Sequence, residues 1–386
     1  MHVLISAMSR FVSPTGICRH AANLAFALEA RREIRRISFV TGSWQEQYYR
    51  EILKLGRRGK INVVSVPIRN NSLARNLWFM HGLPRMSRAM SADVIHLSFP
   101  VPFDRRSLSS KTVATLHDLY PYDVPESCGF PRAFLMRRVL RKAIANADAI
   151  ACVSQTTLSR LRELFPRAAQ KSVKIFNVVR RWEVTPRMPA GVPFRDFALM
   201  VAQHRRNKNL LLALEGFAQL RQQKVITPNA GLVIVGSAGP ETPAIKRTIA
   251  TLQLEGAVLT ISAISDAELC WLYKHCLLFL VTSTTEGFCL PLVEAMLAGC
   301  RIVCSDIPVL REIGSVQCAY FDLKGFPLGN LLYAARKICS HAAPHQTRAS
   351  EFTPEAIGEQ YSDLYFKLVE AQIHSNAGQG IAIASA

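Results

Sequence analysis

Short apolar runs alternate with helical stretches along the whole chain, and this alternation limits the fold more than any other feature. In the first half, the runs with the length and composition of strands are 3–7, 36–41, 62–66, 94–98, 112–116, 149–154 and 173–176. In the second half they are 197–202, 231–236, 258–261, 277–282, 301–305 and 319–321. This pattern predicts an α/β fold with parallel, doubly wound sheets, whose ligands bind outside the carboxyl ends of the strands.

The chain is too long for a single domain, because 386 residues exceed the size at which one hydrophobic core stops growing. Pro186, Pro189, Gly191 and Pro193 have the composition of a linker between the two halves. We expect a basic first domain, a linker, a second domain, an amphipathic helix and a disordered tail. The bounds of these five stretches are 1–180, 181–196, 197–352, 353–374 and 375–386.

Excess positive charge is confined to the first half of the chain. Residues 1–190 hold 31 Lys and Arg against 12 Asp and Glu, whereas residues 191–386 hold 16 of each. Basic clusters lie at 31–36, 57–60 and 137–142, mixed with apolar residues. A surface of this kind attracts an anionic membrane, and the alternative is a solvated basic face. We do not expect nucleic acid as a partner, because no aromatic-interleaved motif accompanies the clusters.

The remaining composition is that of a cytoplasmic globular protein. Apolar residues make up 49% of the chain and charged residues 19%. No apolar run approaches the roughly 18 residues of a membrane-spanning helix, and the start lacks the charged region of a signal peptide. The ten cysteines show no C-x2-C pair, which is typical of buried thiols in a reducing compartment. We expect a cytoplasmic location, with the inner face of a membrane as the alternative.

The segment 286–296 carries most of the functional information. Glu286 and Glu294 lie eight residues apart around a turn that opens a helix, and Pro291 suits the first helical position. Backbone N–H groups of the turn point out of the helix start, where the helix dipole favours a phosphate. The turn consists of Gly287, Phe288, Cys289 and Leu290. The two carboxylates then suit hydroxyl groups, Glu294 those of a ribose and Glu286 those of a sugar; either Glu alone could instead be a solvated residue that the dipole favours.

This spacing resembles the E-x7-E motif of retaining glycosyltransferases with the GT-B fold, in particular family 4 and its mannosyltransferase-like members. The resemblance continues through residues 298–313. It implies two Rossmann-like domains that face each other across a cleft, and a C-terminal helix that returns to the first domain. Cys289 stands where the family commonly has Gly.

The resemblance extends to the ends of strands in the first half. His117 and Asp118 follow the strand expected over 112–116 and resemble the His-Asp-Leu stretch of the mannosyltransferase-like members. It implies that His117 contacts the transferred sugar, and that Asp118 lies near the reacting centre or orients His117. Glu286 completes the implied catalytic set. Gly16 lies in a small turn after the first strand, where the family usually has a Gly pair.

In the second half, residues 202–209 resemble the family's Gly-x-x-x-x-Lys-Asn segment, in which an Arg and a Lys meet the two phosphates of the donor. Lys208 aligns with that Lys. Arg205 and Arg206 both fit the Arg, and the sequence does not separate them. Gly236, after the strand expected over 231–236, resembles a further position that lines the cleft.

These residues predict a retaining hexosyltransferase that acts in cell-surface polysaccharide synthesis. Mannose from GDP-mannose is favoured, with a UDP-sugar as the alternative donor, and the acceptor is a glycan or a lipid-linked glycan. The chain has no Asp-x-Asp, so we expect transfer without a metal or other cofactor. Same-face attack is implied, and a covalent intermediate on Glu286 stays open. Two other functions stay open: a GT-B epimerase or hydrolase without an acceptor, and a non-catalytic binding protein with a basic surface.

Overall fold

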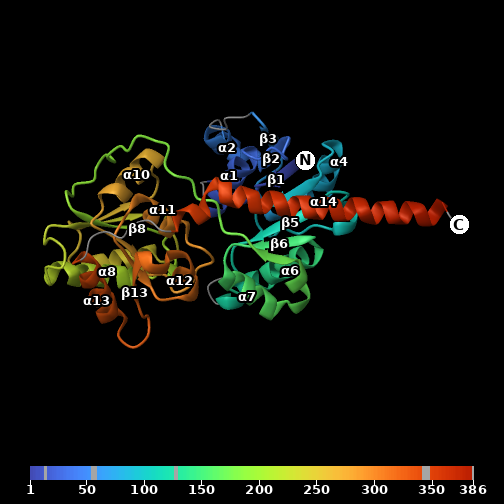
Figure 1. The fold of residues 1–386 in the computed structure, drawn as a ribbon. Coiled ribbons are helices and arrows are strands. Elements are labelled where there is room, and N and C mark those ends of the chain that lie inside the picture. Colours follow the sequence, from blue (N-terminus) through green and yellow to red (C-terminus); the bar gives the residue numbers. More distant parts are fainter. Residues whose placement is uncertain (13–14, 54–58, 126–128, 341–347, 385–386) are drawn as a thin grey trace. The chain divides into compact units, whose positions relative to one another are not determined.

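The structure, a computed structural model, describes residues 1–12, 15–53, 59–125, 129–340 and 348–384, without the side chains of 349 and 373–384. The chain forms two compact units (Figure 1). Unit 1 comprises residues 1–180 and 351–386, and unit 2 comprises residues 181–350. Among the described residues, no helix has both the length and the apolar character needed to cross a membrane.

Unit 1 is built on a seven-stranded sheet in the order β3-β2-β1-β4-β5-β6-β7, and every pairing is parallel. The strand order reverses after β3: β2 and β3 are added on one side of β1, and β4 to β7 are added on the other side. The crossover connections on the two sides of β1 therefore lie on opposite faces of the sheet. The strands are β1 (His2–Ser6), β2 (Arg36–Gly42), β3 (Ile61–Val66), β4 (Val94–Leu97), β5 (Lys111–Leu116), β6 (Ala149–Cys152) and β7 (Ser172–Lys174).

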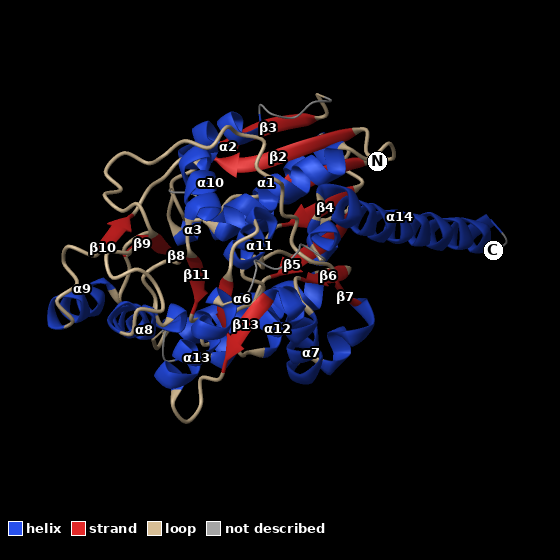
Figure 2. Ribbon diagram, turned by 60° about the vertical axis from the view of Figure 1, so that its left-hand side comes forward, coloured by secondary structure: helices blue, strands red, loops and turns tan. Residues whose placement is uncertain are grey.

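The helices of unit 1 cover both faces of this sheet (Figure 2). The helix α14 lies against α1 so closely that a Cβ added at Gly358 would be 2.6 Å from the carbonyl oxygen of Ala27. The helices are α1 (Gly16–Glu29), α2 (Glu46–Leu53), α3 (Ser72–Leu77), α4 (Leu83–Ala89), α5 (Tyr120–Asp123), α6 (Arg132–Asn146), α7 (Gln155–Leu164) and α14 (Pro354–Ala384).

Unit 2 is built on a six-stranded sheet in the order β10-β9-β8-β11-β12-β13, again with parallel pairings throughout. Its strands are β8 (Phe197–Val201), β9 (Gly231–Val235), β10 (Val258–Ile261), β11 (Leu278–Val281), β12 (Ile302–Ser305) and β13 (Cys318–Phe321). Its helices are α8 (Leu210–Gln222), α9 (Thr242–Thr251), α10 (Asp266–His275), α11 (Leu290–Ala298), α12 (Pro308–Gly314) and α13 (Pro327–Cys339). The central strands are buried on both faces, which explains why they read as continuous apolar runs in the sequence.

The predicted doubly wound architecture is confirmed for each unit, and each of the thirteen predicted strands has its counterpart. Two local predictions differ from the structure. Pro291 is the second residue of α11, because the helix begins at Leu290. The helix α14 continues to Ala384, where the sequence predicted a disordered tail from residue 375. Extension of an existing helix avoids the cost of nucleation, so the helix continues past Gly378 and Gly380.

Candidate active site

The turn between β11 and α11 is anchored by hydrogen bonds from polar side chains. Thr282 Oγ1 donates to the carbonyl oxygens of Lys208 and Asn209 at 2.9 and 3.0 Å, and Ser305 Oγ donates to the Ser283 carbonyl at 2.6 Å. These bonds tie the end of β11 to the loop after β8 and to β12. Two loops that are far apart in sequence are thereby fixed at the carboxyl edge of the unit 2 sheet.

Lys208 and Glu286 meet at this edge. Lys208 Nζ donates to Glu286 Oε1 at 2.5 Å, and Ser283 Oγ donates to the same oxygen at 2.7 Å. The side chain of Glu286 is 9% exposed and that of Lys208 is 21% exposed. The structure therefore brings together two residues that the sequence singled out in separate motifs, and adds Ser283, which the sequence analysis missed.

The electrostatics of this pair keep Lys208 charged. Burial by itself lowers the pKa of Lys208, but the charge of Glu286 and the hydrogen bond to Glu286 raise it by more, so the net pKa lies above the ordinary lysine value. The Arg205 charge acts on the same pKa and lowers it. Lys208 is thus positively charged at pH 7 beside the turn at which α11 begins.

Cys289 adopts a backbone conformation that favours glycine, with φ 72° and ψ 72°. This explains why the resembling family commonly has Gly at this position. The thiol is buried, and burial followed by the charge of Glu286 raises its pKa well above the usual cysteine range. Cys289 therefore stays a neutral thiol, and its role is in the shape of the turn.

Glu294 lies on α11 with 6% of its surface exposed. One of its oxygens, Oε2, accepts a hydrogen bond of 2.9 Å from the hydroxyl of Tyr273 on α10. The sequence analysis missed Tyr273, because the packing of α10 on α11 creates this contact and no local motif marks it. The hydrogen bond fixes the position of the carboxylate in the middle of α11.

The loop after β8 places the other predicted cations. Arg205 and Arg206 are exposed, and Arg206 begins the 3-10 turn Arg206–Lys208. Gly236 lies directly under this loop: a Cβ added there would be 1.9 Å from the carbonyl oxygen of Ala202. Glycine at 236 is thus required for the close approach of two backbone segments at the sheet edge.

In unit 1, His117 lies just beyond the end of β5. Its Nε2 lies 2.8 Å from the Ser98 carbonyl oxygen. A carbonyl oxygen only accepts hydrogen bonds, so Nε2 is the donor. Nδ1 is therefore the acceptor nitrogen in the neutral ring. Burial lowers the pKa of His117, and the Ser98 bond and the Asp118 charge offset only part of that effect. His117 is therefore neutral at pH 7, with Nδ1 as its acceptor nitrogen.

Two further histidines surround His117, and the sequence analysis missed both. The rings of His20 and His117 meet edge to face with 4.8 Å between centroids, and His96 lies 6.5 Å from His20. His96 is held by the Thr115 hydroxyl at 2.9 Å and the Tyr365 hydroxyl at 2.7 Å. Burial is the main cause that lowers the pKa of His20 and His96, and that of His96 falls to about 3.

The other two predicted residues of unit 1 lie at loop positions. Asp118 is exposed, and its Oδ1 accepts from the Tyr120 backbone N–H at 3.1 Å. Gly16 begins α1, directly after Thr15. Ser13 and Pro14 of the same turn lie outside the described residues.

The predicted site residues thus form two groups, one in each unit. In unit 2, the ion pair joins Lys208 to Glu286, with Cys289 and Glu294 on the adjoining turn and helix. In unit 1, His117 belongs to a buried histidine cluster. Within the described ranges, no group of three or more His, Cys, Asp or Glu side chains is arranged to hold a metal ion, and metal independence stays a prediction.

Comparison with known proteins identifies both halves of the chain. Residues 14–181 match the family described as Glycosyltransferase Family 4, and residues 193–315 match Glycosyl transferases group 1. The chain is 22% identical over 308 residues to the O-antigen chain mannosyltransferase RfbU of Salmonella typhimurium, which covers 78% of this chain and 81% of the relative. It is 26% identical over 212 residues to O-antigen chain mannosyltransferase B of Escherichia coli. This match covers 53% of this chain and 55% of that relative.

A solved structure shares the fold over nearly the whole chain. The crystal structure of HepE from Anabaena in complex with UDP and glucose superposes with a TM-score of 0.63 at 18% identity. The superposition covers 98% of this chain and 100% of HepE. The two family matches, the mannosyltransferase relatives and this fold agree, and the chain therefore belongs to the family 4 glycosyltransferases with the GT-B fold.

Proposed function

We propose that this glycosyltransferase transfers a hexose, with mannose favoured, from a nucleotide diphosphate sugar to a glycan or lipid-linked acceptor in cell-surface polysaccharide synthesis. The observation that carries the proposal is the buried pairing of Lys208 with Glu286 beside the turn that opens α11. A fixed cation next to a helix start is an arrangement that stabilises a leaving diphosphate. The anomeric configuration of the donor is retained.

The roles of the unit 2 residues follow from charge. Lys208 stays cationic because Glu286 raises its pKa, so it offsets negative charge that develops on the leaving diphosphate. Arg205 or Arg206 supplies the second cation, and both are exposed on the loop after β8. Glu294, held by Tyr273, accepts hydrogen bonds from the ribose hydroxyls, and Glu286 accepts from hydroxyls of the transferred sugar.

The reaction breaks the bond between C1 of the sugar and the β-phosphate oxygen and forms a bond from C1 to the acceptor oxygen on the same face. The acceptor proton passes to the departing phosphate oxygen, so no external base is required. His117 contacts the transferred sugar, with Asp118 beside it. Transfer without a metal stays a prediction.

GDP-mannose is the favoured donor because both relatives named above are mannosyltransferases. The UDP bound in HepE supports a UDP-sugar as the alternative. A cytoplasmic protein at the inner face of a membrane, held through its basic first domain, would meet a lipid-linked acceptor there.

A transfer assay tests this proposal. The full chain is incubated with radiolabelled GDP-mannose or labelled UDP-sugars and a lipid-linked glycan extract, with and without EDTA, and label is followed into the glycan. We expect transfer from GDP-mannose that EDTA leaves unchanged. Release of free sugar or an epimerised donor without acceptor would favour the hydrolase or epimerase, and no turnover of any donor would favour a binding protein.

A further inference from the structure

Unit 1 exposes a group of large apolar side chains at the start of α6. Phe130 is 91% exposed, more than any other large apolar side chain of the described residues. Phe134 and Leu135 follow on the helix with 52% and 58% exposed, and Met136 is also exposed. Contiguous apolar side chains on a surface mark an interaction site, whereas single exposed ones do not.

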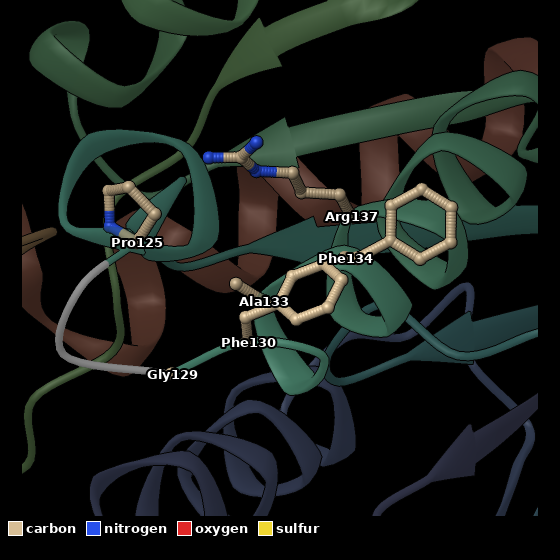
Figure 3. Close-up of a pocket in the computed structure, with 6 residues that line it drawn as sticks. All are labelled: Pro125, Gly129, Phe130, Ala133, Phe134 and Arg137. Carbon is tan, nitrogen blue, oxygen red and sulfur yellow. The ribbon is translucent and has the colours of Figure 1, made fainter.

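Phe130 and Phe134 border an open hollow of about 330 Å³. Figure 3 shows the rings of Phe130 and Phe134, the methyl group of Ala133 and the long side chain of Arg137 around it. The hollow thus combines hydrocarbon walls with a cation at its rim.

Cations accompany these apolar side chains along the whole helix. The helix α6 contains no Asp or Glu, and its cations are Arg132, Arg137, Arg138, Arg141 and Lys142. The Arg138 guanidinium lies 5.9 Å from the ring centroid of Phe134. In the described part of the chain, none of these five cations forms an ion pair with a carboxylate. The surface therefore presents unneutralised positive charge directly beside exposed apolar groups.

The opposite side of α6 holds the helix rigidly in the unit. Leu140, Ala143 and Ile144 are buried in the hydrophobic core of unit 1. The apolar groups on the outer side therefore have no place in that core, and a second environment is needed to cover them.

The basic cluster at 31–36 lacks this combination. Its one large apolar residue, Ile34, is fully buried, and Arg31 pairs with Glu33 at 3.3 Å. Sequence alone does not separate these two clusters, but only the cluster on α6 joins charge to exposed apolar surface. Residues 57 and 58 of the basic cluster at 57–60 lie outside the described residues.

We propose that the α6 face, defined by Phe130, Phe134, Leu135, Arg138 and Arg141, docks on an anionic lipid bilayer. The aromatic rings enter the boundary between headgroups and acyl chains, and the cations contact the headgroups, as on interfacial amphipathic helices. A bilayer suits the face better than an acidic protein does, because it supplies hydrocarbon and negative charge at adjoining depths over the length of the helix. This inference rests on the proposed function in one respect: the docked membrane is the one in which the lipid-linked acceptor lies.

Sedimentation of the full chain with lipid vesicles tests this docking. Vesicles of phosphatidylcholine alone are compared with vesicles that also contain phosphatidylglycerol, at low and high salt. We expect binding only to the anionic vesicles, weakened by salt. The double variant Phe130→Glu/Phe134→Glu should bind about 100-fold more weakly, because each buried Phe contributes about tenfold and the two factors multiply.

A matched control makes the same kind of change elsewhere. Phe326 and Tyr333 of unit 2 are 68% and 73% exposed, and the double variant Phe326→Glu/Tyr333→Glu alters net charge equally. We expect it to bind vesicles like the unchanged protein. Charge reversal of Arg31 and Arg35 should also have a smaller effect than Arg138→Glu/Arg141→Glu.

Three results would overturn the proposal: no binding of the unchanged protein to anionic vesicles, equal loss in the α6 and control variants, or a larger effect of Arg31 and Arg35. Absence of vesicle binding would instead leave the face to a protein partner. The shift of the thermal unfolding midpoint by nucleotides is measured on the same protein preparations. This shift tests the proposed function independently of vesicle binding. Nucleotide binding without vesicle binding overturns the docking alone, and the reverse overturns the donor site alone.

Discussion

Lys208 and Glu286 depend on each other in the folded protein. Lys208 is the cation we assign to the diphosphate, and Glu286 is the carboxylate that keeps it charged in a largely buried place. Removing one member of such a pair leaves the other unpaired, which costs more than replacing both. Their contributions to stability and to activity can therefore be separated.

We predict that Glu286→Gln lowers the free energy of unfolding by about 2 kcal/mol and kcat by about 100-fold or more. The double variant Glu286→Gln/Lys208→Met should regain part of the stability but none of the activity, because no uncompensated charge remains. Urea unfolding and transfer rates of the single and double variants measure this. Additive losses of stability would contradict the coupling of the two side chains.

The spacing of Glu286 and Glu294 and the position of Lys208 were readable from the sequence, because they belong to local motifs beside strand ends. Ser283 and Tyr273 were not, because their contacts with the two carboxylates arise from packing between elements. The backbone of Cys289 is an intermediate case: the resembling family's Gly pointed to it, and the φ of 72° gives the physical reason.

At the scale of elements, α14 is tied to the unit 1 sheet through buried polar groups. The Tyr365 hydroxyl meets His96 Nδ1 at 2.7 Å, and the Tyr361 hydroxyl lies 3.4 Å from Thr115 Oγ1. Sequence periodicity predicted the strands because parallel strands buried on both faces read as apolar runs. It could not predict this histidine cluster, because the three histidines come from α1, β4 and the loop after β5.

The buried histidines make unit 1 sensitive to acid. The pKa of His96 falls from 6.5 to about 3 on folding, so between these values the unfolded chain binds more protons and stability declines as the pH falls below 6.5. We predict a loss of about 2 kcal/mol from His96 alone between pH 7 and pH 5. Hydrogen exchange of β4 and α14 at the two pH values measures it. His96→Gln should flatten the dependence and His275→Gln, at an exposed position, should not; equal slopes in all three proteins would contradict it.

At the scale of the whole molecule, the division into two units matches the division of charge. All of the excess positive charge lies in residues 1–190, which contain nearly all of unit 1 outside α14, while the residues assigned to the donor lie in unit 2. Length and alternation of elements were enough to predict two doubly wound units. The choice of α6 over the 31–36 cluster required side-chain exposure, which the sequence does not give.

The most direct measurement is thermal unfolding of the full chain with GDP, UDP, ADP, dTDP and their sugars at equal concentration. A ligand at 100 times its dissociation constant adds about 2.7 kcal/mol to stability. We expect GDP species to raise the unfolding midpoint of the unchanged protein and of His117→Ala alike, and Lys208→Ala to lose most of the shift. No shift with any nucleotide, or an undiminished shift in Lys208→Ala, would contradict a nucleotide-sugar site at Lys208 and Glu286.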